Sequence, residues 1–219
     1  MGFASSSIGR KIIMGICGAI WAGFVFVHMA GNMLILVSAE LYNKYGHAIV
    51  SNKPLLFAAE AVLLGSIVVH AIVGIWLAIE NRRARQQKYA ITPSGEKRSA
   101  LASRTMAFQG SILLFFIIYH LITFKYGTVY MVSYEGVEMR DLHRLVLEIF
   151  QQPVYIVGYI ICLLLLGWHL SHGVASVFQT LGLSHPSYRK RVLWIGRVYS
   201  VVVAAGFISQ PLYVIANSF

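Results

Sequence analysis

Long runs of apolar residues dominate the chain, and charged residues gather in the shorter stretches between them. A helix that crosses the roughly 30 Å hydrocarbon core of a bilayer needs about 20 residues. Five runs reach that length, at about 12–37, 55–79, 101–124, 154–181 and 198–216. The runs lack the period-two alternation of barrel strands, so helices must satisfy the backbone hydrogen bonds in lipid. The pattern predicts an all-α membrane protein in which residues 1–219 form a single transmembrane domain.

Composition and charge agree with this prediction. The chain is 58% hydrophobic and 12% charged, with a mean hydropathy of +0.68, which is too apolar for a soluble domain. Thirteen Lys and Arg residues lie in the N-terminal segment and in the second and fourth connections, against five on the other side. Basic residues prefer the cytoplasmic side, so we expect the N-terminus in the cytoplasm. We attribute the net charge of +10 to anionic lipid or an acidic partner, and we expect no nucleic acid.

Histidines provide the most informative polar pattern within the apolar runs. The chain has eight histidines, and each of the first four spans has one main histidine position: His28, His70, His120 and His169. Ionisable groups are costly in the bilayer interior and usually have a function there. Counting from the cytoplasmic end of each span puts His28 and His120 at roughly 24 to 26 Å, and His70 and His169 at roughly 18 to 20 Å. We call His28 and His120 the outer pair, and His70 and His169 the inner pair.

Two imidazoles at each of two levels are what two haems with bis-histidine ligation require. A haem iron accepts one nitrogen on each face, and facing helices of a bundle can supply both. The first four spans are therefore predicted to form a haem-binding four-helix bundle. Gly74 and Gly173 follow His70 and His169 by four residues, which would leave room for a flat macrocycle. Similar clearance, or plain helix packing, is expected in the first span from Gly15, Gly18, Gly23 and Gly31.

Segments of four spans together resemble a known family. They are SSSIGRKIIMGICGAIW leading to VHMAGN, VVHAIVGIWLAIENRRAR, SRTMAFQGSILLFFIIYH and WHLSHGVASVFQTLG. In order and spacing the chain resembles the single-chain, five-helix, diheme cytochrome b subunit of succinate dehydrogenase and fumarate reductase, over nearly its whole length. The resemblance implies that His70 and His169 ligate the haem nearer the cytoplasm, and that His28 and His120 ligate the outer haem.

The same resemblance implies a function. The subunit would anchor a flavoprotein subunit and an iron–sulphur subunit to the bacterial cytoplasmic membrane, and would pass electrons between the iron–sulphur subunit and membrane quinone, expected to be menaquinone. Two haem b groups would be its cofactors, while succinate and fumarate would bind to the soluble partners. The direction of the reaction in the respiratory chain or tricarboxylic acid cycle, and dimerisation of the complexes, stay open.

Candidates for a quinone site lie near the outer ends of the spans. Quinone reduction needs an apolar slot, hydrogen-bond donors and a route for protons. We name Glu60, Asn32, His47 and Tyr42 as candidates, with an interfacial or structural role as the alternative for each.

Two residues near the ligand of the fourth span qualify the resemblance. His172 follows His169 by about one turn and could contact the same haem, although packing or hydrogen bonding is the simpler role. Some diheme fumarate reductases carry a glutamate two residues before this ligand and use it in transmembrane proton transfer. Gly167 occupies that position here, so the sequence does not support that route.

Rival interpretations remain open. Ascorbate-reducing transmembrane cytochromes also distribute haem ligands over four helices, but they lack an iron–sulphur partner. The cytochrome b of bc complexes fits less well, because it places two ligands on each of two helices. A proton-coupled transporter could use the histidines as a relay, yet such proteins often show repeated halves or broken helices, which the sequence does not reveal.

Overall fold

Five long apolar helices form the body of the molecule. The computed structural model describes residues 2–3, 6–83 and 101–217, without the side chains of residues 101–104. The segments able to cross a membrane are Ser7–Leu36, Lys53–Arg83, Thr105–Lys125, Pro153–Thr180 and Pro186–Ala216. They coincide with the five predicted spans apart from their ends. The chain is therefore a multi-pass helical membrane protein with five candidate spans.

The helices have the following bounds. The long ones are α1 (Ser7–Asn32), α3 (Lys53–Arg83), α4 (Leu101–His120), α6 (Pro153–Thr180) and α7 (Arg189–Ala216). Helix α1 continues into a 3-10 turn, η2 (Met33–Leu36), α4 continues into a π-helical turn, η4 (Leu121–Lys125), and η5 (Pro186–Tyr188) precedes α7. The Ser6 hydroxyl accepts a hydrogen bond from the Gly9 backbone N–H and caps α1, while Pro153 occupies the first turn of α6.

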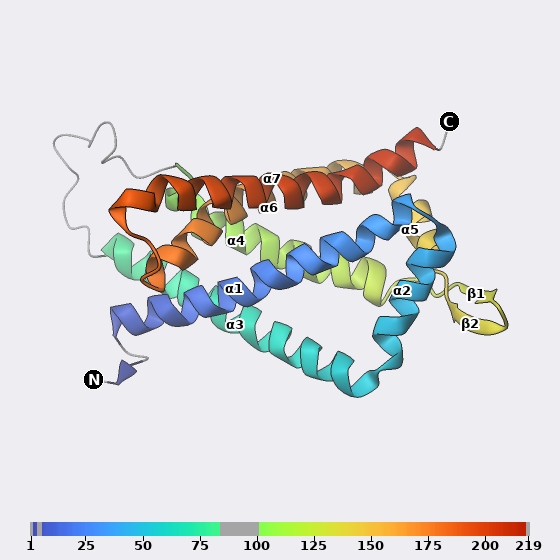
Figure 1. Ribbon diagram of the computed structural model, residues 1–219, viewed down its shortest axis with the longest axis horizontal. Helices are drawn as coiled ribbons and strands as arrows, with labels where there is room; N and C mark the ends of the chain where they lie inside the picture. Colours follow the sequence, from blue (N-terminus) through green and yellow to red (C-terminus); the bar gives the residue numbers. More distant parts are fainter. Residues whose placement is uncertain (1, 4–5, 84–100, 218–219) are drawn as a thin grey trace.

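Helices α1, α3, α4 and α6 surround a common interior. In this four-helix ring α1 packs on α3 and α6, and α4 also packs on α3 and α6. Helix α7 lies along α6 and also contacts α1 (Figure 1). Across the two diagonals of the ring, α1 with α4 and α3 with α6, the described backbones make few or no close contacts. Side chains on diagonal helices therefore face one another across the interior.

Polar contacts between spans fix how these helices lie. The indole Nε1 of Trp21 on α1 donates to the backbone oxygen of Leu63 and to the hydroxyl of Ser66, both on α3. The hydroxyl of Tyr199 on α7 donates to the backbone oxygen of Ala22. Interhelical hydrogen bonds of this kind hold helices together where lipid removes the hydrophobic driving force.

A small cap covers the end of the bundle opposite the N-terminus (Figure 1). It consists of α2 (Ala39–Ser51), the antiparallel strands β1 (Met131–Tyr134) and β2 (Val137–Arg140), and α5 (Leu142–Phe150). At its centre the buried Asn43 side chain donates to an Asp141 carboxylate oxygen at 2.8 Å and accepts from the His143 backbone N–H at 2.9 Å.

The fold is all-helical as predicted, apart from the short hairpin of β1 and β2. Its strands have four residues each, too short for an alternating pattern to stand out in the sequence. The turn between them has positive φ at both central residues, Glu135 (53°) and Gly136 (80°), as a type I′ hairpin turn requires. The spans are all-helical, and the departure is confined to this connection.

Two predicted boundaries also need comment. Helix α7 begins at Arg189, not near Val198, because its first turns carry the cations and extend beyond the apolar run. The connection between the second and third spans, with Arg85, Lys88, Lys97 and Arg98, lies outside the described residues.

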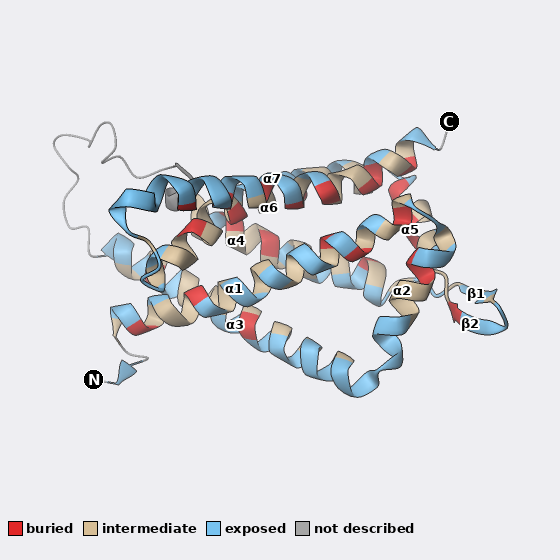
Figure 2. Ribbon diagram, viewed as in Figure 1, coloured by how far each residue is buried: buried red, intermediate tan, exposed pale blue. Residues whose placement is uncertain are grey.

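Burial differs among the spans (Figure 2). On α3 only Ser66 and Leu77 are buried, whereas α7 has a continuous buried face against α6 and α1. Large apolar side chains are exposed along all five long helices, which suits a protein whose solvent is lipid.

Candidate functional site: two histidine pairs

The four histidines of the spans meet as two pairs across the diagonals of the ring. The rings of His70 on α3 and His169 on α6 have centroids 6.5 Å apart, at an interplanar angle of 70°. The rings of His28 on α1 and His120 on α4 have centroids 5.8 Å apart, at 84°. These are the inner and outer pairs that depth along the spans predicts. Whether a haem joins each pair stays a prediction.

Two glycines flank the inner pair on the other diagonal. A Cβ atom added to Gly18 of α1 would lie 3.2 Å from Cε1 of His70, and one added to Gly110 of α4 would lie 3.5 Å from Cε1 of His169. The backbones of α1 and α4 thus approach the imidazole rings closely at this level. A side chain at either glycine would enter the space beside a histidine.

The two levels repeat at a constant interval along three helices. Tyr159 of α6 lies at the outer level, with its ring centroid 6.3 Å from that of His120. Helices α1, α4 and α6 each have a paired histidine at one level and a second residue of the site at the other level. The two residues are ten positions apart, or about 15 Å along the helix. They are Gly18 and His28, Gly110 and His120, and Tyr159 and His169.

The inner pair has one ring fixed by a hydrogen bond and one without a partner. Nδ1 of His70 lies 3.1 Å from the backbone oxygen of Met14. Since a carbonyl oxygen can only accept, Nδ1 carries the hydrogen and Nε2 keeps a free lone pair, the arrangement found in most metal-binding histidines. Nδ1 of His169 is buried without a hydrogen-bond partner. This buried nitrogen therefore lacks the hydrogen bond that Nδ1 of His70 has.

A hydrogen-bonded chain approaches His28 in the outer pair. The backbone oxygen of His28 can only accept, so the Asn32 side-chain atom 2.8 Å away is the amide nitrogen. The same nitrogen lies 3.3 Å from Nδ1 and 3.4 Å from Nε2 of the ring. Oδ1 of Asn32 accepts from the Tyr42 hydroxyl at 2.8 Å. Burial, and to a lesser extent Tyr45, raises the pKa of Tyr42, so its hydroxyl keeps the proton that it donates.

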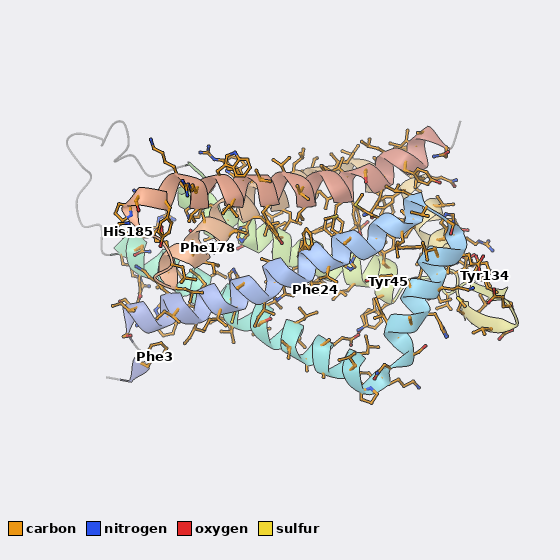
Figure 3. All side chains as sticks on the ribbon, in the orientation of Figure 1. Phe3, Phe24, Tyr45, Tyr134, Phe178 and His185 are labelled. Carbon is orange, nitrogen blue, oxygen red and sulfur yellow. The ribbon has the colours of Figure 1, made fainter. Side chains whose placement is uncertain are left out.

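Aromatic rings fill the rest of the outer level. Phe24 stacks on the His28 ring at 5.3 Å, and Phe207 of α7 lies 5.8 Å from it. Figure 3 labels Phe24 on α1. The centroid of His120 lies 5.3 Å from that of Phe124 and 6.1 Å from that of Phe116. The outer pair is therefore enclosed by side chains where the inner pair is flanked by glycine.

The donor set fits haem better than a bare metal ion. Within residues 6–83 and 101–217, no group of three or more His, Cys, Asp or Glu side chains could hold a metal ion. Structural zinc sites need about four protein ligands, whereas each pair here offers two. Haem supplies four nitrogens of its own and leaves two axial positions. A metal–imidazole bond of about 2 Å puts the centroids of two axial rings about 6 Å apart, close to both observed separations.

The fit is more direct for the inner pair. Its histidine rings and flanking glycines already have a suitable arrangement. In the outer pair the Asn32 amide nitrogen is a donor, and it competes with a metal for a ring lone pair of His28. Binding there requires this amide to move.

The glycines that follow the inner histidines lie near methionine side chains, and the room that they would leave for a macrocycle stays a prediction. A Cβ on Gly74 would meet the sulphur of Met14 at 3.7 Å, and one on Gly173 would meet Cε of Met106 at 4.0 Å. They face methionines of neighbouring helices, because packing decides which side chain lies opposite a given face. Gly110, which sequence reasoning missed, lies beside a ring instead. Its spacing of ten residues from His120 was the available signal.

The structure places the remaining residues named from the sequence in different parts of the molecule. Glu60 forms an ion pair with Lys125 at 2.6 Å, at the outer end of α3 and in the turn η4. His47 lies on α2, where its backbone oxygen accepts from the Ser51 hydroxyl. His172 is hydrogen bonded to the Ser176 hydroxyl at 3.1 Å. Of the quinone-site candidates, Asn32 thus contacts His28 directly, and Tyr42 is linked to it through Asn32.

An open apolar hollow of about 510 Å³ lies between α2 and α3, lined by Tyr45, Asn52 and apolar residues of both helices. Tyr45, labelled in Figure 3, packs against Gly31, and a Cβ at Gly31 would overlap its ring. Gly31 follows His28 by three residues. The hollow is therefore close to the outer pair.

The chain matches no protein-family model, no curated protein and no solved structure. Its class, a helical membrane protein with five candidate spans, rests on the structure, and the resemblance to the diheme cytochromes rests on the residues alone.

Proposed function

We propose that this chain is the membrane-anchor cytochrome b subunit of a succinate:quinone oxidoreductase, either a succinate dehydrogenase or a quinol:fumarate reductase. In this proposal it lies in the bacterial cytoplasmic membrane with its N-terminus in the cytoplasm. It passes electrons between an iron–sulphur subunit and menaquinone or menaquinol, and a flavoprotein subunit completes the complex. The observation that carries the proposal is the meeting of four partly buried histidines as two pairs, on the two diagonals of one four-helix ring.

Each residue near the pairs has a definite task in this proposal. His70 and His169 would hold one haem b, and His28 and His120 would hold the other. When bound, haem b supplies reversible one-electron redox chemistry. The backbone oxygen of Met14 orients His70 and keeps its hydrogen on Nδ1.

The hollow beside the outer pair is the best place for quinone. Its walls are apolar, as the ring and isoprenoid tail of a menaquinone require, and Tyr45 and Asn52 supply polar groups. Glu60 lies on α3 near this region and is held by Lys125, so it is a candidate for proton exchange.

Cations at the opposite end of the bundle suit the soluble partners. Exposed Arg82 and Arg83 end α3, and exposed Arg189, Lys190 and Arg191 begin α7. Topology puts these two helix ends on the side where α1 begins (Figure 1). Such a basic face favours association with an acidic protein surface.

A haem assay on the protein purified in mild detergent tests the proposal. We expect two haem b per chain, an iron–sulphur and a flavoprotein subunit in the same preparation, and reduction of both haems by succinate. His185→Ala is a matched control, because this exposed histidine bonds to Ser187 outside the pairs and its loss should leave the haem content unchanged.

Other outcomes would reject the proposal in favour of a named rival. A chain that purifies alone with two haems and is reduced by ascorbate would be an ascorbate-type cytochrome. A chain that binds no chromophore when haem is supplied would favour a proton-coupled transporter.

A further inference from the structure

Two buried polar atoms without partners lie at the level of the inner pair. They are Oε1 of Gln109 and Nδ1 of His169, among four such side-chain atoms in the described part of the chain. Buried polar groups are nearly always hydrogen bonded, because leaving one unpaired is unfavourable. These two exceptions therefore call for a physical explanation.

Gln109 faces the interior of the bundle at this level. Its side chain is only 1% exposed. It belongs to the same stripe of α4 as Leu113, Phe116 and His120, since the steps of four, three and four residues keep one face of a helix. It is eleven residues, or about 16 Å, from His120, which puts it near the inner level.

The backbone of α4 contacts the His169 ring at the next residue. Gly110 lies beside Cε1 of His169, the ring carbon between the two nitrogens. Helices α4 and α6 also pack against each other directly. The side chain of Gln109 is thus anchored close to the ring whose Nδ1 has no partner.

The two atoms have complementary chemistry. Nε2 of Gln109 donates to the Thr105 hydroxyl oxygen, and Oε1 remains as an acceptor. A histidine that offers Nε2 to a metal carries its hydrogen on Nδ1, which is then a donor.

We propose that Gln109 is a positioning residue for His169: its Oε1 accepts a hydrogen bond from Nδ1–H, directly or through one bridging water. Gln109 would then do for His169 what the backbone oxygen of Met14 does for His70. The link to redox properties rests on the proposed function, in which this pair holds a haem. An acceptor at Nδ1 makes the imidazole more basic, which favours the oxidised iron and lowers the reduction potential.

Substitution of Gln109 tests this role through spectroscopy and potential. In Gln109→Leu the acceptor is lost at similar volume, so the midpoint potential of one haem should rise and its low-spin electron paramagnetic resonance signal should shift, while the other haem stays unchanged. Gln109→Glu keeps an acceptor and should not raise the potential. Ser111→Ala on the same helix, whose hydroxyl bonds to the Ala107 backbone oxygen, is the matched control.

Unchanged potential and spectrum in Gln109→Leu would overturn the proposal. If that variant loses its inner haem, rescue by Gln109→Glu supports the hydrogen bond, and loss in both variants assigns Gln109 to packing alone. In metal-free protein with ¹⁵N-labelled histidine, the Nδ1–H of His169 should be protected from exchange and should lose protection in Gln109→Leu. This last measurement also decides the inference if the wild type binds no haem, an outcome that rejects the proposed function separately.

Discussion

The inner and outer pairs each consist of two histidines on one diagonal of the same ring, yet their surroundings differ. Glycine flanks the inner pair, through Gly18 and Gly110. Aromatic rings and the Asn32 amide surround the outer pair. The inner pair is therefore prepared for a flat ligand, whereas the outer pair must rearrange to take one.

The difference teaches that a ligand set does not by itself make a binding site. Preorganised neighbours reduce the free energy lost on binding, and a competing donor adds to it. The outer end of the bundle also has a cap, a hollow and an ion pair.

Loss of one ligand should give the largest effect. Replacing His169 with Leu removes one axial nitrogen from the inner pair, so the haem content should fall from two to one per chain and the inner haem should be the one lost. Replacing His120 with Leu should remove the outer haem instead. Redox titration and a haem assay would show this, and loss of the outer haem alone in His169→Leu would mean that the pairing is wrong.

A side chain at Gly18 should affect the inner pair alone. In Gly18→Leu the new atoms enter the space beside His70, where even a Cβ would lie 3.2 Å from Cε1. Such overpacking costs about 1–3 kcal/mol, so we expect strong loss of inner haem and a lower melting temperature. Gly23→Leu is the control, because nothing lies within 4 Å of its Cβ position. Equal haem loss in both variants would contradict the special role of Gly18.

The order in which the two pairs bind haem should show a smaller effect. When haem is titrated into metal-free protein, the inner pair should fill first, because the outer pair must displace the Asn32 amide. One hydrogen bond of about 0.5–1.5 kcal/mol corresponds to a two- to tenfold change in affinity. In Asn32→Ala the difference in haem affinity between the two sites should fall by that factor, and absorbance would follow the titration. Filling of the outer pair first would refute the comparison.

The smallest effect is expected at the ion pair of the outer level. Glu60 and Lys125 are 37% and 39% exposed, so Glu60→Gln should cost about 1 kcal/mol or less and leave both haems bound. Quinol-linked turnover of the complex is the sharper measurement. A large loss of turnover with full haem content would assign Glu60 to proton exchange, while an unchanged rate would leave it a structural residue.

Sequence reasoning succeeded best where a local property decided the outcome. The five spans followed from the length of the apolar runs, and the pairing of the histidines followed from their depth. It failed for the cap, because α2, α5 and the hairpin are short and carry no long apolar run. It also missed Gly110, because depth along a helix does not tell which neighbour lies opposite a face.

The quinone-site candidates show the same limit. Sequence alone put Asn32, Tyr42 and Glu60 in one outer region. Tertiary structure joined Asn32 and Tyr42 to His28 and gave Glu60 a separate partner at the π-helical turn after His120.

By itself the sequence determined that the chain has five long apolar helices and that four histidines occupy two depths in them, because hydropathy and the rise per residue are properties of one segment at a time. Only the tertiary structure decided which helices stand on a diagonal, which glycines lie beside a ring and which amide approaches His28. Those features depend on the rotation of each helix about its axis, and that rotation is fixed by packing between segments far apart in the chain.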